Sequence, residues 1–198
     1  MDIVNRVQNI LLKPKEEWVK IKSESISVNQ LFTSYAIFLA AIPAIAQFIG
    51  LGLVGRRIPF FGWYRYPLGR ALLYAILMYV FSLVSVYIFG IVINALAPSF
   101  GSKQNMENAM KLAVFSMTAS WVVGILYIIP FLGFLALIAS LYGLYILYLG
   151  FNTPMMDTPK EKVAGYFVVS LIVVIVLTSV IFFVLGAIFA VGGVGTAL

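Results

Sequence analysis

The 45 residues from 112 to 156 include no Asp, Glu, Lys or Arg, and this uncharged stretch constrains the fold more than any other feature. As one straight α-helix the stretch would be about 67 Å long. The hydrocarbon core of a bilayer is only about 30 Å thick, so the stretch is too long for one transmembrane helix and suits two. Residues 130–133, Pro-Phe-Leu-Gly, lie near its middle and predict a tight reversal. The sequence therefore predicts a helical hairpin within a membrane.

The rest of the chain is also strongly apolar. Hydrophobic residues make up 63% of it and charged residues 10%, whereas soluble domains contain about 25% charged residues. We expect an all-α polytopic membrane protein, a bundle of five transmembrane helices with a short amphipathic N-terminal segment at residues 1–30. The five-span domain covers residues 31–190, and a Gly-rich tail follows at 191–198. The expected spans are residues 31–54, 70–96, 109–129, 134–151 and 163–190.

Capping signals predict where several helices begin. Ser27 precedes an apolar run in a pattern that fits a capping box, and Asn105 follows a polar connector. Thr158, Pro159 and Glu161 place an N-cap residue, a proline and an acid at the first positions of the last helix. The signals agree with the five expected spans.

Residues 1–30 form the only extended polar segment, and a stripe of apolar residues at spacings of three and four runs through it. Pro14 interrupts the stripe and predicts the start of a second short helix. Because basic residues flank the stripe, we expect it to lie in the membrane interface. The alternative is a docking surface for a protein partner, with Pro14 and Trp18 as contacts.

The distribution of basic residues predicts the orientation. With the N-terminus inside, cytoplasmic segments carry nine Lys and Arg residues and the opposite side carries four. The positive-inside rule therefore favours a cytoplasmic N-terminus and, with five spans, a C-terminus on the opposite side. The net charge of +6 lies in loops beside apolar spans, which indicates contact with anionic lipid headgroups and no nucleic acid.

The loop after the first expected span reads GRRIPFFGWYRYPLG, residues 55–69, and combines arginine with aromatic residues. This composition is typical of the membrane–water interface. We expect lipid contacts at Arg56, Arg57, Trp63 and Arg65. The alternative is a re-entrant or substrate-contacting loop.

Catalytic patterns are missing from the sequence. The chain has no His and no Cys, so the commonest general base and metal ligand is lacking, and no acid lies inside an expected span. Gly50, Gly52 and Gly55 match the spacing of a dinucleotide-binding motif, but they end a membrane span and no acid follows in residues 56–92. We interpret these glycines as close helix packing or a break at the end of the span. We expect no enzyme activity, no metal and no cofactor.

Two side-chain stripes suggest contacts within the membrane. Tyr142, Tyr145 and Tyr148 recur at spacing three, a pattern typical of packing and interface anchoring. Their polar ends could line a groove shared with Tyr127. The other stripe is Ala36, Ala40 and Ala44, whose small size permits a helix to approach closely, either in the same chain or in a homo-oligomer.

The chain resembles the Yip family of Ypt/Rab-interacting membrane proteins, especially its bacterial inner-membrane branch. The similarity covers nearly the whole chain and is carried by AAIPAIAQFIG (residues 40–50), LYGLYILYLG (residues 141–150), Pro14 and Trp18. It implies five membrane helices with a cytosolic N-terminus in the cell membrane and, in eukaryotic relatives, a role in vesicle traffic through Rab GTPases. The chain lacks the Asp-Leu-Tyr-Gly-Pro motif of those relatives.

Two functions remain in view. The first is a non-enzymatic scaffold or adaptor in membrane organisation or trafficking, with a protein partner bound by the N-terminal segment. The second is a carrier or lipid-remodelling protein for a neutral or amphipathic substrate, with headgroups at the arginine loop and the tyrosine groove as the path.

Overall fold

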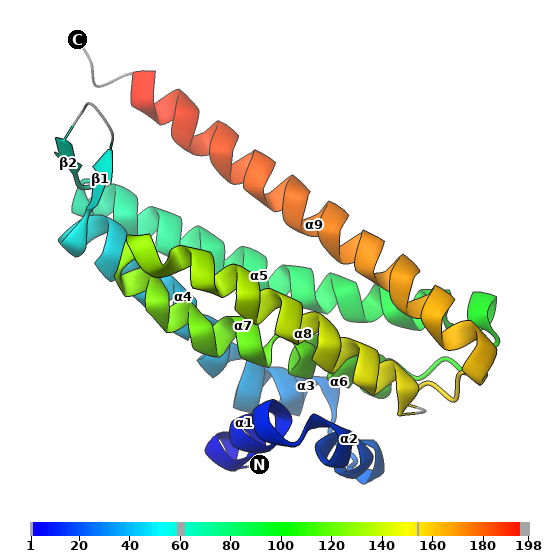
Figure 1. Cartoon of the computed structure of the whole chain (residues 1–198). Helices are drawn as coiled ribbons and strands as arrows, with labels where there is room; N and C mark the ends of the chain where they lie inside the picture. Colours follow the sequence, from blue (N-terminus) through cyan, green and yellow to red (C-terminus); the bar gives the residue numbers. More distant parts are fainter. Residues whose placement is uncertain (1, 59–61, 154, 195–198) are drawn as a thin grey trace.

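Five long apolar helices dominate the computed structural model, which describes residues 2–58, 62–153 and 155–194, with backbone alone at 56–58, 137 and 188–194 (Figure 1). By length and composition each helix could cross a membrane, which confirms the prediction of an all-α polytopic fold. The candidate spans are Val28–Val54, Leu68–Phe100, Met106–Ile128, Pro130–Asn152 and Lys160–Ala187.

Two short helices, α1 (Ile3–Leu12) and α2 (Pro14–Ser23), precede the first span. The Asp2 side chain accepts a hydrogen bond from the Asn5 amide and caps α1. Pro14 is the first residue of α2, as predicted, because a proline there gives up only an amide that the helix leaves unpaired. We call α1 and α2 together the N-terminal cap.

The first span is made of α3 (Val28–Leu31), α4 (Ile37–Phe48) and two π-helical segments, Phe32–Ala36 and Ile49–Val54. Its start is confirmed, since the Ser27 side chain accepts a hydrogen bond from the Gln30 amide. Gly55 ends the span with a φ of 82°, a conformation that residues with a side chain rarely adopt. The glycine therefore acts as the predicted break at the end of the span.

A short β-hairpin follows, where the sequence predicts only an interfacial loop. Strands β1 (Arg56–Ile58) and β2 (Gly62–Tyr64) pair antiparallel, with Arg56 opposite Tyr64. The second span is α5 (Leu68–Leu96), extended by a 3₁₀ turn at Ala97–Phe100. The hairpin lies at the end of the molecule opposite the N-terminal cap (Figure 1).

The third and fourth spans form the predicted helical hairpin. The third is α6 (Met106–Ser116), α7 (Thr118–Val123) and a 3₁₀ segment (Gly124–Ile128), and the fourth is a 3₁₀ segment (Pro130–Phe134) followed by α8 (Leu135–Asn152). Ile129 between them is extended, with φ −109° and ψ 100°. A residue before proline is pushed out of the helical region, so Pro130 sets the reversal. Asn105 caps α6, as predicted.

The last helix, α9 (Lys160–Val194), runs along the outside of the bundle (Figure 1). Its predicted start is wrong in detail. The helix begins at Lys160, one residue after Pro159, and the Thr158 hydroxyl accepts a hydrogen bond from Ser102 at 2.8 Å. Ser102 and Thr158 are both buried, so a contact between two connectors takes the hydroxyl that the sequence assigns to the helix cap.

The alanine stripe on the first span packs against other helices of the same chain. Ala36, Ala40 and Ala44 are all buried, and α4 packs against α5 and α7. Close approach of helices at small residues is the expected use of such a stripe. The stripe is therefore not available for self-association in this structure, and these alanines do not support the expectation of a homo-oligomer.

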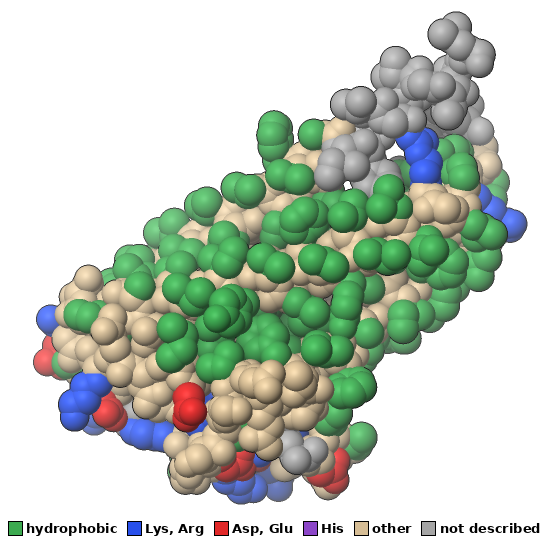
Figure 2. All heavy atoms as spheres, turned by 180° about the vertical axis from the view of Figure 1, so that it is seen from behind, with side chains coloured by type: hydrophobic (Ala, Val, Ile, Leu, Met, Phe, Trp, Pro, Cys, Tyr) green, Lys and Arg blue, Asp and Glu red, His purple; other side chains and the backbone are tan. Residues whose placement is uncertain are grey.

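Apolar and charged side chains lie in separate zones of the surface (Figure 2). Apolar side chains cover the middle of the molecule, while acidic side chains and most basic ones gather at the end that carries the N-terminal cap. Several large apolar side chains of α9, such as Ile172, Ile175 and Phe183, are exposed. An apolar middle between polar ends is the surface that a bilayer requires.

Candidate functional site

The N-terminal cap folds onto the bundle through its apolar stripe. Ile10, Trp18 and Ile21 are completely buried. The Trp18 indole donates a hydrogen bond from Nε1 to the carbonyl of Ile146 on α8 at 2.9 Å. It also meets the Phe115 ring edge to face, with ring centroids 6.3 Å apart. A buried indole N–H needs such a partner, so this bond fixes where α2 sits on α8.

Gly150 makes room for the indole on α8. A Cβ atom at this position would lie 2.9 Å from two carbons of the Trp18 ring and 2.5 Å from Leu112 Cδ2. Real Cβ contacts are longer, so a side chain at 150 would displace the indole or Leu112. The Gly at the end of LYGLYILYLG and the Trp of the N-terminal segment are thus two halves of one contact.

This packing corrects one expectation from the sequence. Pro14 and Trp18 were candidates for contact with a partner, but both are buried against the chain's own helices. The apolar residues of the stripe face the bundle, and the placement of the segment in the membrane interface stays a prediction. An amphipathic stripe shows that a helix covers an apolar surface, and the sequence pattern does not say which surface.

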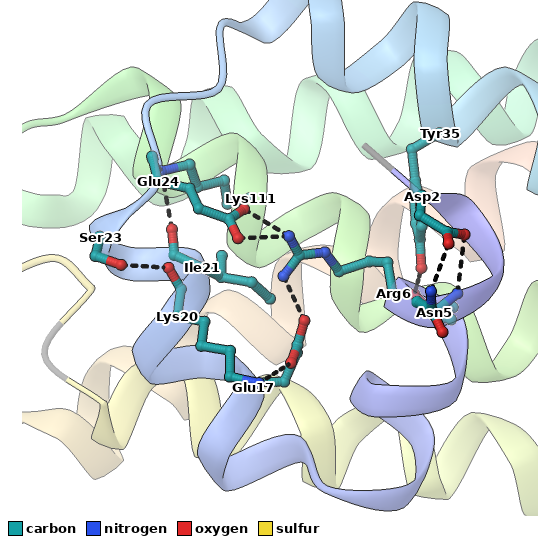
Figure 3. Close-up of polar contacts among 11 residues, drawn as sticks. Asp2, Asn5, Arg6, Glu17, Lys20, Ile21, Ser23, Glu24, Tyr35 and Lys111 are labelled. Atoms are coloured by element: carbon teal, nitrogen blue, oxygen red, sulfur yellow. Dashed lines mark hydrogen bonds and ion pairs between the residues drawn. The ribbon is translucent and has the colours of Figure 1, made fainter.

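An ion cluster joins the two cap helices to each other (Figure 3). The Arg6 guanidinium contacts the Glu17 carboxylate through Nη1, and both Glu24 oxygens lie 2.6 Å from Nη2. The guanidinium also lies over the Phe115 ring, 5.6 Å from its centroid. The side chains of Arg6 and Glu17 are 9% and 4% exposed, so each charge depends on the other.

Lys111 attaches this cluster to the third span (Figure 3). It is 1% exposed, and its Nζ donates to the backbone carbonyls of Ile21 and Glu24 and to Asn108 Oδ1. Ile21 and Glu24 lie at the C-terminal end of α2, where carbonyls lack helical partners and a cation is favourable. The ammonium group therefore closes the end of one helix from within another.

Sequence reasoning missed the role of Lys111 and assigned it only to topology. The signal was present, because Lys111 lies in the first turn of the expected span 109–129, which has no other charged residue, and charges there are costly unless paired. Its partners are backbone carbonyls, which no sequence pattern displays. A third polar contact, Tyr35 Oη to Thr118 Oγ1 at 2.8 Å, ties the first span to the start of α7.

The predicted lipid contacts lie at the opposite end. Trp63 and Arg65 are exposed, and the Trp63 indole donates from Nε1 to the Val54 carbonyl at 2.9 Å. The side chains of Arg56 and Arg57 lie outside the described residues. The hairpin is therefore attached to the end of the first span, and lipid contact at Trp63 and Arg65 stays a prediction.

The four tyrosines do not share one groove. Tyr142 donates from its hydroxyl to the Leu11 carbonyl at 2.6 Å and so supports the cap, and Tyr148 meets Phe167 on α9 edge to face at 5.3 Å. Tyr145 is exposed. Tyr127 instead lines three partly open cavities, and none of the stripe tyrosines lines them. The stripe serves packing and surface positions, and Tyr127 belongs to a separate region.

The glycines that resemble a nucleotide motif are packing glycines, as interpreted from the sequence. A Cβ at Gly50 would lie 2.0 Å from the Tyr127 carbonyl oxygen, and one at Gly52 would lie 3.0 Å from Ala71 Cβ. Side chains at these positions would push the first span away from its neighbours. Among the described residues, no group of three His, Cys, Asp or Glu side chains could hold a metal ion.

The family model of the Yip1 domain matches residues 9–183. The chain belongs to the Yip family. Comparison with curated proteins and with solved structures finds no match. The match includes all of α2, so the cap helix that carries Trp18 is part of the Yip1 domain. The protein is a multi-pass membrane protein of this family.

Proposed function

We propose that this Yip-family protein is a non-enzymatic scaffold or adaptor, and that the outward face of its N-terminal cap binds a cytosolic protein partner. The observation that supports the proposal is a set of aliphatic side chains left exposed on the cap. Val4, Leu12 and Val19 are 64%, 79% and 62% exposed, although they lie outside every candidate span. Exposed aliphatic residues outside the spans are the kind of side chain that anchors a protein partner.

The cap is built to present this face. Ile10, Trp18 and Ile21 hold its inner side against the bundle, and Lys111 holds the end of α2. The exposed residues of the cap include the aliphatic side chains, three lysines and one acid, namely Lys13, Lys15, Lys20 and Glu16. Apolar anchors with basic residues around them suit a partner whose surface combines an apolar patch with acidic residues. The site therefore moves from Pro14 and Trp18, as expected from sequence, to the opposite side of the same helices.

Site-specific photocrosslinking in native membranes tests this proposal. A photoreactive amino acid replaces Leu12 or Val19, and a third variant carries it at Ile172, an exposed position in the middle of α9. We expect the two cap positions to give one discrete protein adduct and Ile172 to give lipid adducts. Val4→Asp on the same face should reduce the cap adduct roughly fivefold or more, the effect of losing over about 1 kcal/mol of binding.

Two crosslinking results would contradict the adaptor proposal. If Leu12 and Val19 crosslink only to lipid, the cap lies on headgroups and the adaptor proposal is wrong. An unchanged yield of the protein adduct in Val4→Asp and Lys15→Glu also contradicts it, because the partner would then not bind through this face. Protein yield and gel-filtration profile report whether each variant remains folded.

A further inference from the structure

Three cavities adjoin one another along the membrane-spanning bundle, each partly open at its surface, and Tyr127 lines all of them. The first, about 630 Å³, lies beside the β-hairpin and is lined by Trp63, Gln47 and the reversal after Tyr127. The second, about 240 Å³, shares Gln47 and Tyr127 with the first. The third, about 460 Å³, lies between α7, α8 and α9 and shares Ser120 and Thr178 with the second. Cavities of a few hundred Å³ are the size at which small ligands bind.

No charged side chain lines any of the three among the described residues. A charge placed there would lose its hydration without gaining an ion partner, which is costly in a low-dielectric interior. The lining therefore disfavours ions and charged headgroups. It accepts apolar groups and uncharged hydrogen-bonding groups.

Gln47 supplies the one fully buried polar atom without a partner in the described lining. Its Oε1 atom is buried and has no hydrogen-bond partner. A buried amide oxygen without a partner costs free energy, which a ligand hydroxyl at this point would recover. A hydroxyl can both donate and accept, so it matches an amide in either orientation.

The third cavity has a different character, although it contains several serines. Ser116 and Ser140 donate their hydroxyls to carbonyls of their own helices, those of Leu112 and Ala136. Both hydroxyls therefore have hydrogen-bond partners within their own helices. The remaining lining is largely aliphatic, including Leu144, Leu171 and Ile175. This branch suits an apolar chain. It lies against α9, whose outer side chains are exposed along the bundle surface.

We propose that these cavities form a binding site for one uncharged amphipathic molecule, with a hydroxyl-bearing head at Gln47 and Tyr127 and an apolar chain between α8 and α9. A diacylglycerol is the simplest member of this chemical class. The site is separate from the cap surface and does not depend on the adaptor proposal.

The test uses the full chain in phosphatidylcholine nanodiscs and a diacylglycerol with a photoreactive diazirine in one acyl chain. A phosphatidic acid with the same chains is the charged comparison. We expect saturable labelling of α8 and α9 by the diacylglycerol, with competition by unlabelled diacylglycerol. The phosphatidic acid should give only non-saturable labelling, because no described side chain of the lining carries a positive charge for its phosphate.

Gln47→Met removes the amide at nearly constant shape, and Asn94→Leu is its matched control. Asn94 is also a span amide with a buried, unpartnered oxygen, but it lines none of the three cavities. Gln47→Met should weaken the diacylglycerol probe roughly three- to tenfold, the effect of one lost hydrogen bond, while Asn94→Leu leaves its affinity unchanged. Without probe, the Tm of Gln47→Met should equal or exceed that of the wild type, since an unpaired polar group is gone.

Several results would overturn the proposal. Labelling that does not saturate, or equal saturable labelling by phosphatidic acid, removes the chemical selectivity. Equal affinity of wild type and Gln47→Met removes the head position. A lower Tm for Gln47→Met without probe would assign the amide a structural role in place of a binding one.

Discussion

Gly150 shows how a single residue without a side chain permits the cap to dock. The Trp18 indole occupies the space that a Cβ at position 150 would need, and Leu112 approaches from the other side. The contact joins residues 132 positions apart in the chain, and the side chains of Trp18 and Leu112 in it are completely buried. Its stability therefore responds to one methyl group.

Gly150→Ala should destabilise the protein by about 1–3 kcal/mol, since the added methyl overpacks the indole contact. Gly186→Ala on α9 is the control, because a Cβ there meets nothing within 4 Å. Alanine is the better helix former, so the control should be neutral or slightly stabilising. Thermal unfolding in detergent, followed by Trp fluorescence, measures both. Equal Tm values for Gly150→Ala and the wild type would show that Trp18 does not lie where the structure places it.

The cap as an element depends on buried charges that balance one another. Arg6 and Lys20 both pair with Glu17, but Arg6 is buried and Lys20 is 63% exposed. Removing one partner of a buried pair leaves an uncompensated charge, whereas an exposed pair contributes little. The two pairs therefore have very different weights, although both involve the same carboxylate.

Arg6→Met should undock the cap, at a cost of about 3–5 kcal/mol for the stranded Glu17 charge. Lys20→Met should change stability by less than about 1 kcal/mol. Hydrogen exchange of the backbone amides of α1 and α2 measures whether the cap is docked, with fast exchange expected only in Arg6→Met. Protected amides in both variants would mean that the ion cluster does not hold the cap.

Some elements of the fold can be predicted from the sequence, and the positions of others cannot. The hairpin of the third and fourth spans follows from the uncharged stretch and from Pro130, because both act locally. The position of α2 does not follow, since an apolar stripe fits lipid, a partner or the bundle equally well. The cavities at Tyr127 are harder still, because they depend on where packed helices leave space between them, which no local sequence pattern records.

At the scale of the whole molecule, charge is divided between two ends. All seven acidic residues lie in the segments expected on the cytoplasmic side, whereas the β-hairpin region carries arginine without any acid. Figure 2 shows this division around an apolar middle. The positive-inside rule counts Lys and Arg, and nine of thirteen lie on the cap side. The adaptor proposal requires that side to be cytoplasmic.

The most direct test is the side of the membrane on which the cap lies. The chain has no cysteine, so Lys13→Cys, Lys103→Cys and Arg65→Cys each introduce a single thiol at an exposed position. In intact cells an impermeant maleimide should label only Arg65→Cys, and the other two should react only after the membrane is opened. Labelling of Lys13→Cys from outside, or of Lys13→Cys and Arg65→Cys from the same side, would contradict the five-span arrangement with a cytosolic cap.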